Sequence, residues 1–520
     1  MNKRLLIAAL LSFVAVGAMQ FFMGKNKPAP GAGGVAQEVK AGQFYAAQAQ
    51  QYWPDELNRE VDFVKVKDFK TDVLSVETDL YKATFSNVGG LLESLSFKKY
   101  KDRDGQFLQT IYKQGAKTLE NGCFLLAFEG ESPLEYKLVE HKEDDNFITI
   151  GYQTEYNQWV VKKTYLLNKA SHQMDLVLDF EPKAKDVTEL IPRIFFPSPE
   201  LEEFKSDDVS CFVNKGIKSI EKISANKELS GVWGMPEIFG IQSKYFAHSL
   251  VKDNEHFVCG GYLKKVNNKL FSILLGNSIK KKDSYKLSFY MGPKQIDSLE
   301  KVDERLEGLL SFGWFSWLSR LFLKWLASMY KYFGNYGIAI IVLTILLKIP
   351  FMPLTIIAGR KMEEYQKYQP TLGRIRQKFR QDPARQQAEI VKFHKDHNIS
   401  PATSMIGCLP VLIQIPILIS LYRGLGNYLD LYQAPFFGWI TDLSVKDPYY
   451  VLPILMGVAM LWGQKLKPPA GDPKMKVVGM FMPIVVTAVF INFPAGLALY
   501  WCVNNILTVG EDLLRKKIFK

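Results

Sequence analysis

The stretch IIVLTILLKIP, residues 340–350, places one lysine inside a run that is otherwise apolar. Lys348 is twelve residues from Tyr336 and twelve from Arg360, which is about 18 Å from either end of a helix. A lysine side chain does not snorkel that far, and an unpaired charge at mid-span costs about 2.5–3.5 kcal/mol on insertion scales. The stretch therefore predicts a transmembrane helix over 336–357 in which Lys348 needs water or a partner.

Further apolar runs follow this helix, and the charges between them predict which way each one crosses. The runs predict spans over 404–424, 450–463, 477–493 and 495–512. The net charge is +12, whereas residues 25–331 carry equal numbers of acidic and basic side chains. The excess lies near residues 3–4, 357–403, 465–476 and 511–520, so the positive-inside rule predicts that these segments are cytoplasmic. The last three spans are short, which predicts local thinning of the bilayer.

The N-terminal part of the chain predicts an anchor and an exported domain. Residues 5–23 are apolar enough for a membrane anchor, with a cleaved signal peptide at Val16-Gly17-Ala18 as the alternative. Residues 24–59 are rich in Pro, Ala, Gly and Gln and predict a flexible linker. Residues 60–300 predict an all-β sandwich from alternating runs at 73–76, 81–85, 147–150, 174–178 and 287–290.

An amphipathic pattern over 301–334 predicts a helix along the membrane surface, with a linker helix packed on the sandwich as the alternative. The resulting fold class is an α-helical polytopic membrane protein of six transmembrane helices, five of them in the core, with a periplasmic β domain. Residues 358–403 form a cytoplasmic hairpin and residues 514–520 a basic tail. Both termini are expected in the cytoplasm, with residues 24–334 in the periplasm of a bacterial inner membrane.

Lys348 is also the strongest candidate for function. No acidic residue is expected well inside the other spans, because Glu511 and Asp512 fall at the end of the last one. Pro350 and Pro353 each remove a backbone hydrogen bond beside Lys348, which leaves carbonyl groups that need solvation. These features predict a hydrated, positively charged groove that lowers the cost of moving a polar stretch of polypeptide across the bilayer.

Neutral polar side chains in the spans extend this candidate groove. Tyr500, Asn504 and Thr508 recur every four residues and share one helix face. The candidate groove residues are Lys348, Thr344, Gln414, Tyr500, Trp501, Asn504, Asn505 and Thr508. For the neutral residues the alternative is helix-to-helix hydrogen bonding, worth about 0.6 kcal/mol each.

Other function classes have weaker support. The β domain shows no basic face with interleaved aromatic residues, which argues against nucleic-acid binding. The sequence contains no P-loop, nucleophile elbow or HExxH motif, so no motif of this kind indicates an enzyme. No cofactor is expected. His394 and His397 are spaced for a metal but lack a third ligand.

A secondary transporter would show internal repeats and a buried acid paired with the charge. A sugar-modifying β domain would need carboxylates beside His141, His172, His248 or His256.

Several motifs around Lys348 resemble those of the YidC/Oxa/Alb insertase family. They are Asn335-Tyr-Gly337, Pro353-Leu-Thr355, Gly407 to Ile417, Asp442-Leu-Ser444, Asp447-Pro-Tyr-Tyr450, Leu452 to Gly457 and Phe493 to Leu497. From the resemblance we take Pro350, Pro353, Asp447, Pro448 and Tyr449 as structural motif residues. The layout also resembles the Gram-negative form, whose periplasmic domain is a β-supersandwich similar to the galactose-mutarotase fold.

The resemblance implies insertion of nascent membrane proteins without nucleotide, alone or with the Sec translocon, through a groove open to cytoplasm and lipid. It also implies that the basic cytoplasmic segments help receive substrate or the ribosome. Two positions depart from the family pattern. Lys348 stands where arginine is usual, which keeps the charge but loses the bidentate guanidinium. Trp501 stands where tyrosine is common, which keeps an aromatic wall but removes a hydroxyl.

Overall fold

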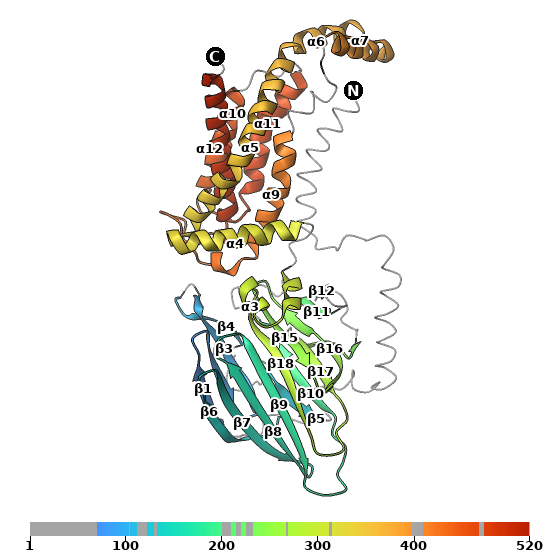
Figure 1. Cartoon of the computed structure of the whole chain (residues 1–520), viewed down its shortest axis with the longest axis vertical. Helices are drawn as coiled ribbons and strands as arrows, with labels where there is room; N and C mark the ends of the chain where they lie inside the picture. The colour runs from blue at the N-terminus through green and yellow to red at the C-terminus, as the bar shows by residue number, and fades with distance from the viewer. Residues whose placement is uncertain are drawn as a thin grey trace.

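The computed structural model describes residues 70–518 except 103, 112–121, 129–132, 200–209, 215–219, 225–231, 267–268, 311–314, 398, 400–408 and 467–472. The predicted anchor (1–23) and linker (24–59) lie outside the described residues. The chain forms a β domain and a helical bundle, with one helix lying across the end of the bundle between them (Figure 1).

The β domain contains eighteen described strands in three antiparallel sheets. They are β1 (Val73–Glu77), β2 (Tyr81–Ser86), β3 (Leu91–Lys101), β4 (Phe107–Ile111), β5 (Leu125–Phe128), β6 (Lys137–Glu143), β7 (Phe147–Tyr156), β8 (Trp159–Asn168), β9 (Gln173–Pro182), β10 (Pro192–Pro197), β11 (Ser210–Asn214), β12 (Ile220–Ser224), β13 (Val232–Gly234), β14 (Phe239–Gln242), β15 (Phe246–Asp253), β16 (Val258–Val266), β17 (Lys269–Gly276) and β18 (Asp283–Pro293). The sheet orders are β1-β2-β3-β4, β13-β16-β17-β10-β5 and β12-β11-β14-β15-β18-β9-β8-β7-β6. The five runs predicted to be strands therefore all form strands.

Alternation along β8 shows why these sequences form half-buried strands. Every second residue from Trp159 to Leu167 is fully buried, while the residues that alternate with them are partly exposed. Lys163 occupies the same buried face, where its ammonium donates to the carbonyls of Gly89 (3.0 Å) and Phe124 (2.6 Å). Burial lowers the pKa of Lys163 to about 7. The main core cluster draws on strands of all three sheets, which makes the domain one packed unit.

The described helices cover the rest of the chain. They are α3 (Ile296–Glu300), η3 (Glu304–Leu309), α4 (Ser316–Phe333), α5 (Tyr336–Lys367), α6 (Gln369–Lys378), α7 (Pro383–Asp396), α9 (Leu409–Gly426), η5 (Leu429–Leu431), α10 (Val451–Leu466), α11 (Pro473–Phe490) and α12 (Ala495–Ile518). The hairpin α6–α7 and the end of α12 lie at the same end of the bundle (Figure 1).

The bundle differs from the predicted spans in length. Among the described residues α5 is the one helix long and apolar enough to cross a membrane, and α10 and Gly479–Phe490 are shorter apolar helices. α12 has 24 residues, about 36 Å, and so extends beyond the span predicted for 495–512, whose bounds stay a prediction. It continues because Glu511, Asp512 and Arg515 are buried and form ion pairs instead of ending the helix. The count of six spans stays a prediction.

Helix α4 lies across the end of the bundle that faces the β domain (Figure 1) and packs on α5 and α9. Phe322, Leu323 and Leu326 are buried, whereas Trp317 on the opposite side is 66% exposed. Gly334 ends the helix in the left-handed conformation (φ 63°), and Asn335 caps α5 by accepting from the amide of Ile338 (3.1 Å). The packing of α4 on core helices argues against a linker helix lying only on the sandwich.

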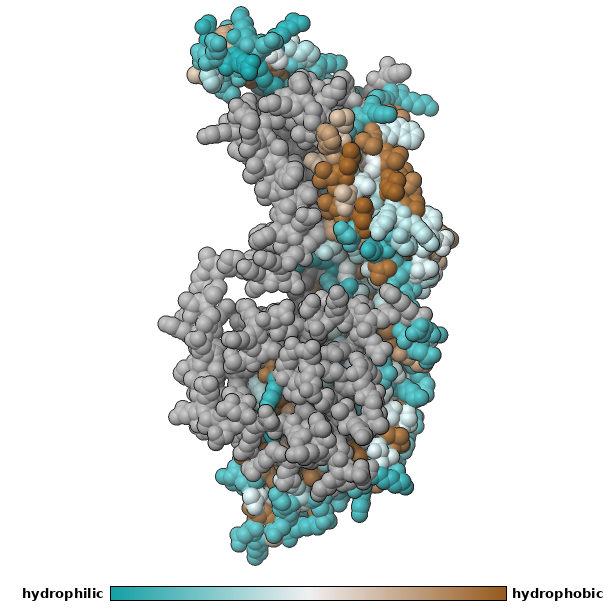
Figure 2. Space-filling view, turned by 180° about the vertical axis from the view of Figure 1, so that it is seen from behind, coloured by the Kyte–Doolittle hydropathy of each residue, from teal (hydrophilic) through white to brown (hydrophobic). Residues whose placement is uncertain are grey.

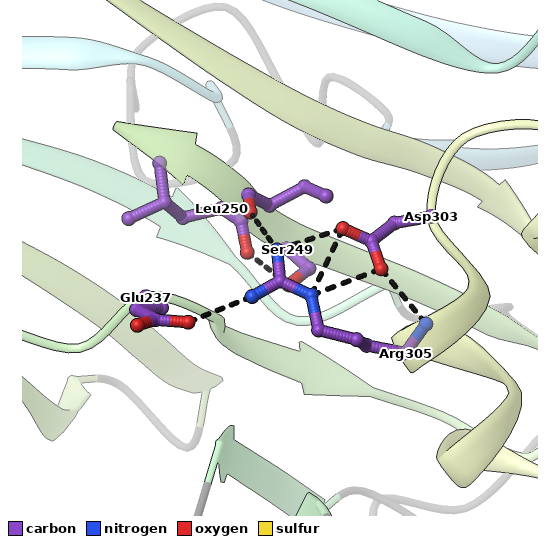
Figure 3. A network of polar contacts seen from close by, with 6 residues as sticks. Glu237, Ser249, Leu250, Asp303 and Arg305 are labelled. Atoms are coloured by element: carbon purple, nitrogen blue, oxygen red, sulfur yellow. Dashed lines mark hydrogen bonds and ion pairs between the residues drawn. The ribbon is translucent and has the colours of Figure 1, made fainter. Parts of the chain in front are cut away.

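Two polar clusters fix the β domain to the segments that lead into the bundle. Figure 3 shows Arg305 of η3 between Asp303 and Glu237, with nitrogen-to-oxygen distances of 2.7 and 2.8 Å. In η5, Asp430 accepts from Gln295 (2.7 Å) and pairs with the ammonium of Lys99 (2.8 Å). Tyr100 donates to the same carboxylate (3.3 Å). Burial and the Asp430 carboxylate raise the pKa of Tyr100, which keeps its hydroxyl protonated as a donor.

Candidate functional site

Lys348 extends from α5 to the neighbouring helix α12. Its ammonium donates to the hydroxyl of Thr508 (2.8 Å) and lies 3.3 Å from a carboxylate oxygen of Glu511. The side chains of Lys348 and Glu511 are 15% and 10% exposed. This pair corrects the prediction that Lys348 has no acidic partner. The prediction failed because Glu511 was expected at the end of the last span, 495–512, whereas α12 continues to Ile518 and Glu511 contacts α5.

A second ion-pair network lies beside this pair. A guanidinium nitrogen of Arg515 lies 3.0 Å from both Glu363 and Asp512. Arg515 and Asp512 are almost fully buried, so each charge depends on the others to offset its desolvation. Gly359 makes room for this network, because a Cβ there would lie 1.8 Å from a nitrogen of Arg515. The sequence carried a signal for these residues, since 511, 512 and 515 follow 508 by three, four and seven residues, which keeps them near the helix face shared by 500, 504 and 508.

Two of the predicted groove residues connect α9 with α12. The amide of Gln414 donates to the hydroxyl of Tyr500, whose side chain is 2% exposed. Trp501 is partly buried and stacks on Phe490 at a centroid distance of 5.5 Å. Gln414 and Tyr500 therefore stabilise helix packing, as the alternative interpretation expected, while Trp501 forms part of an aromatic wall.

The remaining predicted groove residues mostly bond to their own helices. Thr344 is 1% exposed and donates to the carbonyl of Ile340 (2.7 Å), so its hydroxyl is already used inside α5. Asn505 donates to the carbonyl of Trp501 (2.8 Å). Asn504 is buried, and its carbonyl accepts from Thr508 (2.8 Å). Of the neutral candidates, Thr508 is the one that the structure brings to the ammonium of Lys348.

The prolines beside Lys348 lie inside a continuous helix. α5 passes through Pro350 and Pro353 without ending. Since proline has no N–H, the carbonyls four residues earlier, at Leu346 and Ile349, lose their helical donors. The side chain of Ile349 is 62% exposed. The backbone next to Lys348 thus offers additional acceptors at the surface of α5.

Asp447 organises the loop before α10. It is 1% exposed and accepts from the indole of Trp439 (3.0 Å) and from the amides of Tyr449 (3.1 Å) and Leu452 (2.8 Å). Tyr449 is 68% exposed and Pro448 is exposed beside it. Asp447 therefore has a structural role, and the exposed aromatic ring is placed at the same end of the bundle as α4.

The histidines raised by the rival interpretations have ordinary packing roles. The ring of His397 packs against Phe393 (centroid distance 4.1 Å) and edge-on to Tyr368 (5.4 Å) in the hairpin, and His394 packs near Tyr365 (6.1 Å). In the β domain His248 is fully buried between the hydroxyl of Thr110 (3.3 Å) and a backbone carbonyl (3.2 Å). Burial lowers the pKa of His248 to about 4. Within the described part of the chain no group of three metal-ligating side chains occurs.

Comparisons with known proteins cover both halves of the chain. Residues 328–520 match the family described as 60Kd inner membrane protein, and residues 73–325 match the YidC periplasmic domain. The membrane protein insertase YidC of Geotalea daltonii is 32% identical and that of Oleidesulfovibrio alaskensis 31% identical, each over at least 98% of both chains. A crystal structure described as active YidC insertase covers 89% of this chain and 98% of its own at 17% identity and a TM-score of 0.38. The chain belongs to the YidC family of membrane protein insertases.

Proposed function

We propose that this chain passes nascent membrane proteins into the inner membrane through a hydrated groove beside α5 and α12, without a nucleotide. The observation that carries the proposal is the position of Lys348. Its ammonium lies well inside an apolar helix, is partly exposed, and contacts one hydroxyl and one carboxylate oxygen among the described residues. It has three N–H donors, so a passing polypeptide can be bound without unfolding the site.

The energetic role of such a site is to lower the cost of moving polar groups through the bilayer. A charged side chain at the centre of a span costs about 2.5–3.5 kcal/mol on insertion scales. An ammonium near the path stabilises a substrate carboxylate, because Coulomb attraction is stronger where water is scarce. While Glu511 contacts Lys348, its carboxylate offsets the positive charge of the ammonium. A substrate therefore meets a positive charge only when Glu511 moves away from Lys348.

The membrane topology belongs to the same proposal. We place six spans in the inner membrane, with residues 24–334 in the periplasm and both termini in the cytoplasm. Exposed apolar side chains on the bundle support a lipid-facing belt, which Figure 2 shows as a hydrophobic patch below a hydrophilic hairpin. They include Ile349, Leu354, Ile454, Leu455, Val458, Trp462, Phe481 and Ile484. Exposed aromatic residues at the α4 end, Trp317, Phe333, Trp439 and Tyr449, suit a membrane interface.

Partners follow from the surfaces at the cytoplasmic end. The hairpin α6–α7 is basic and largely exposed, which suits binding of substrate or of the ribosome. Cooperation with the Sec translocon is proposed from the family resemblance alone. The buried Lys348–Glu511 pair is a feature that a secondary transporter would also show, but the family assignment favours insertion.

The test is depletion of the protein followed by rescue with variants, scoring insertion of a small membrane protein whose translocated tail is acidic. Lys348→Arg keeps the positive charge and is expected to rescue insertion. Lys348→Ala is expected to reduce insertion about tenfold or more, which corresponds to a loss of about 1.4 kcal/mol of stabilisation or more. Lys331→Ala is the matched control, because Lys331 is an exposed lysine at the end of α4 and lies outside the basic segments proposed to receive substrate. Full rescue by Lys348→Ala at normal protein levels would refute the groove mechanism.

A further inference from the structure

The counter-ion of Lys348 belongs to the protein itself, and this bears on which substrates the groove accepts. Glu511 contacts Lys348 through one oxygen at 3.3 Å, longer than the 2.8 Å contact with Thr508. The other oxygen of Glu511 is buried and has no hydrogen-bond partner among the described residues. The oxygen that faces Lys348 also accepts from the hydroxyl of Thr355 (3.5 Å), so Glu511 is held by two long contacts, and a second carboxylate is able to replace it at Lys348.

Among the described residues, the other cation of the ion pairs beside Lys348 is already occupied. Arg515 is buried and already paired with both Glu363 and Asp512 at 3.0 Å. The two neighbouring groups of ion pairs together contain two cations, Lys348 and Arg515, and three carboxylates, Glu363, Glu511 and Asp512. An acidic segment that enters between α5 and α12 therefore meets a region that is not net positive while Glu511 stays in place.

We propose that Glu511 is a specificity-determining residue whose carboxylate occupies Lys348 at rest and competes with the carboxylates of an acidic substrate segment. This inference rests on the proposed role of Lys348. Acidic segments displace Glu511, and segments with neutral polar residues pass without needing the exchange. The intramolecular acid thereby limits how strongly the groove retains acidic polypeptides, which favours their release into the bilayer.

The test uses the full chain in liposomes and three small membrane proteins that differ only in their translocated tails, which carry Asp, Asn or Lys residues. The measured quantity is the ratio of Asp-tail to Asn-tail insertion. Glu511→Gln is expected to raise this ratio about fivefold or more, a typical size for coupling between two sites. Glu511→Asp is expected to restore a ratio close to that of the unmodified chain.

Asp512→Asn is the matched control, because Asp512 is the adjacent buried acid but pairs with Arg515. It is expected to leave the ratio unchanged. The inference is overturned if Glu511→Gln changes both tails by the same factor, or if Asp512→Asn shifts the ratio equally. If Lys348→Ala lowers Asp-tail insertion while Glu511→Gln leaves the ratio unchanged, only this inference fails. If Lys348→Ala has no effect on Asp-tail insertion, the proposed function itself fails.

A double variant keeps the test decisive if Glu511→Gln accumulates poorly, since that change leaves a buried lysine without its acid. In the Lys348→Met background Glu511→Gln is expected to leave the Asp-to-Asn ratio unchanged, because the competition needs the ammonium. A rise of the ratio in this background would overturn the inference, because Glu511 would then act without Lys348.

Discussion

Replacement of Asp430 by alanine tests how the β domain is held on the bundle. The Asp430 side chain is 9% exposed and accepts from Gln295 and Tyr100 while pairing with Lys99. A hydrogen bond to a charged acceptor contributes about 1.5–3 kcal/mol, and the long contact with Tyr100 falls at the lower end. The Lys99 ion pair adds at most about 1 kcal/mol, because that lysine is 64% exposed.

These terms share one carboxylate and do not simply add, so we expect Asp430→Ala to cost about 3 kcal/mol at this junction. Hydrogen exchange of the purified chain measures it, because the amides of Leu431 and Tyr432 are hydrogen-bonded inside η5 next to Asp430. A loss of that size predicts roughly hundredfold faster exchange of these amides.

Two further variants control this prediction. Asp430→Asn keeps an acceptor but loses the charge, so its effect is expected to be about half as large in free energy. Lys99→Met removes only the exposed ion pair and is expected to change exchange less than about fivefold. If Asp430→Ala exchanged at the rate of the unmodified chain, the junction would not depend on this carboxylate.

Two other predictions concern buried polar groups. Because folding lowers the pKa of Lys163 from 10.5 to about 7, the unfolded chain binds more protons between these values, so the free energy of unfolding should rise with pH from about 7 to 10.5. Lys163→Met should flatten that rise by up to about 4 kcal/mol in denaturant melts at pH 7 and 10, and an unchanged pH slope would contradict it. Asp447→Ala removes three hydrogen bonds from a buried carboxylate and should cost about 3 kcal/mol. Hydrogen exchange at the amide of Leu452 should accelerate, and unaltered protection there would contradict the capping role.

Hydrophobic periodicity carried most of the information about the fold. The alternation in β8 predicts its buried face because a strand buries every second residue, and β8 does so. The spacing of Phe322 and Leu326 predicts the buried side of α4 for the equivalent helical reason. The pattern did not predict the length of α12, because charged residues normally end an apolar helix and here they pair with α5. Pairing between distant segments is a tertiary property that local spacing does not contain.

The site could be predicted only in part for the same reason. The sequence identified Lys348 from its cost in an apolar helix, and the structure brings Thr508 to it as a polar neighbour. It missed Glu511, because a residue at the expected end of a span was assumed to face water. It grouped Thr344 with the groove from helical spacing, although a threonine in a helix readily bonds to the carbonyl four residues earlier.

The most direct test of the central claim is to capture a substrate beside Lys348 during insertion. A substrate with one cysteine in its acidic tail is inserted by the full chain carrying either Thr508→Cys or Val458→Cys. Thr508 contacts Lys348, whereas Val458 on α10 is 53% exposed and lies in the proposed lipid-facing belt. We predict a disulfide-linked adduct at position 508 and little at position 458. Adducts at position 458 alone, or equal adducts at both positions, would contradict passage of the substrate past Lys348.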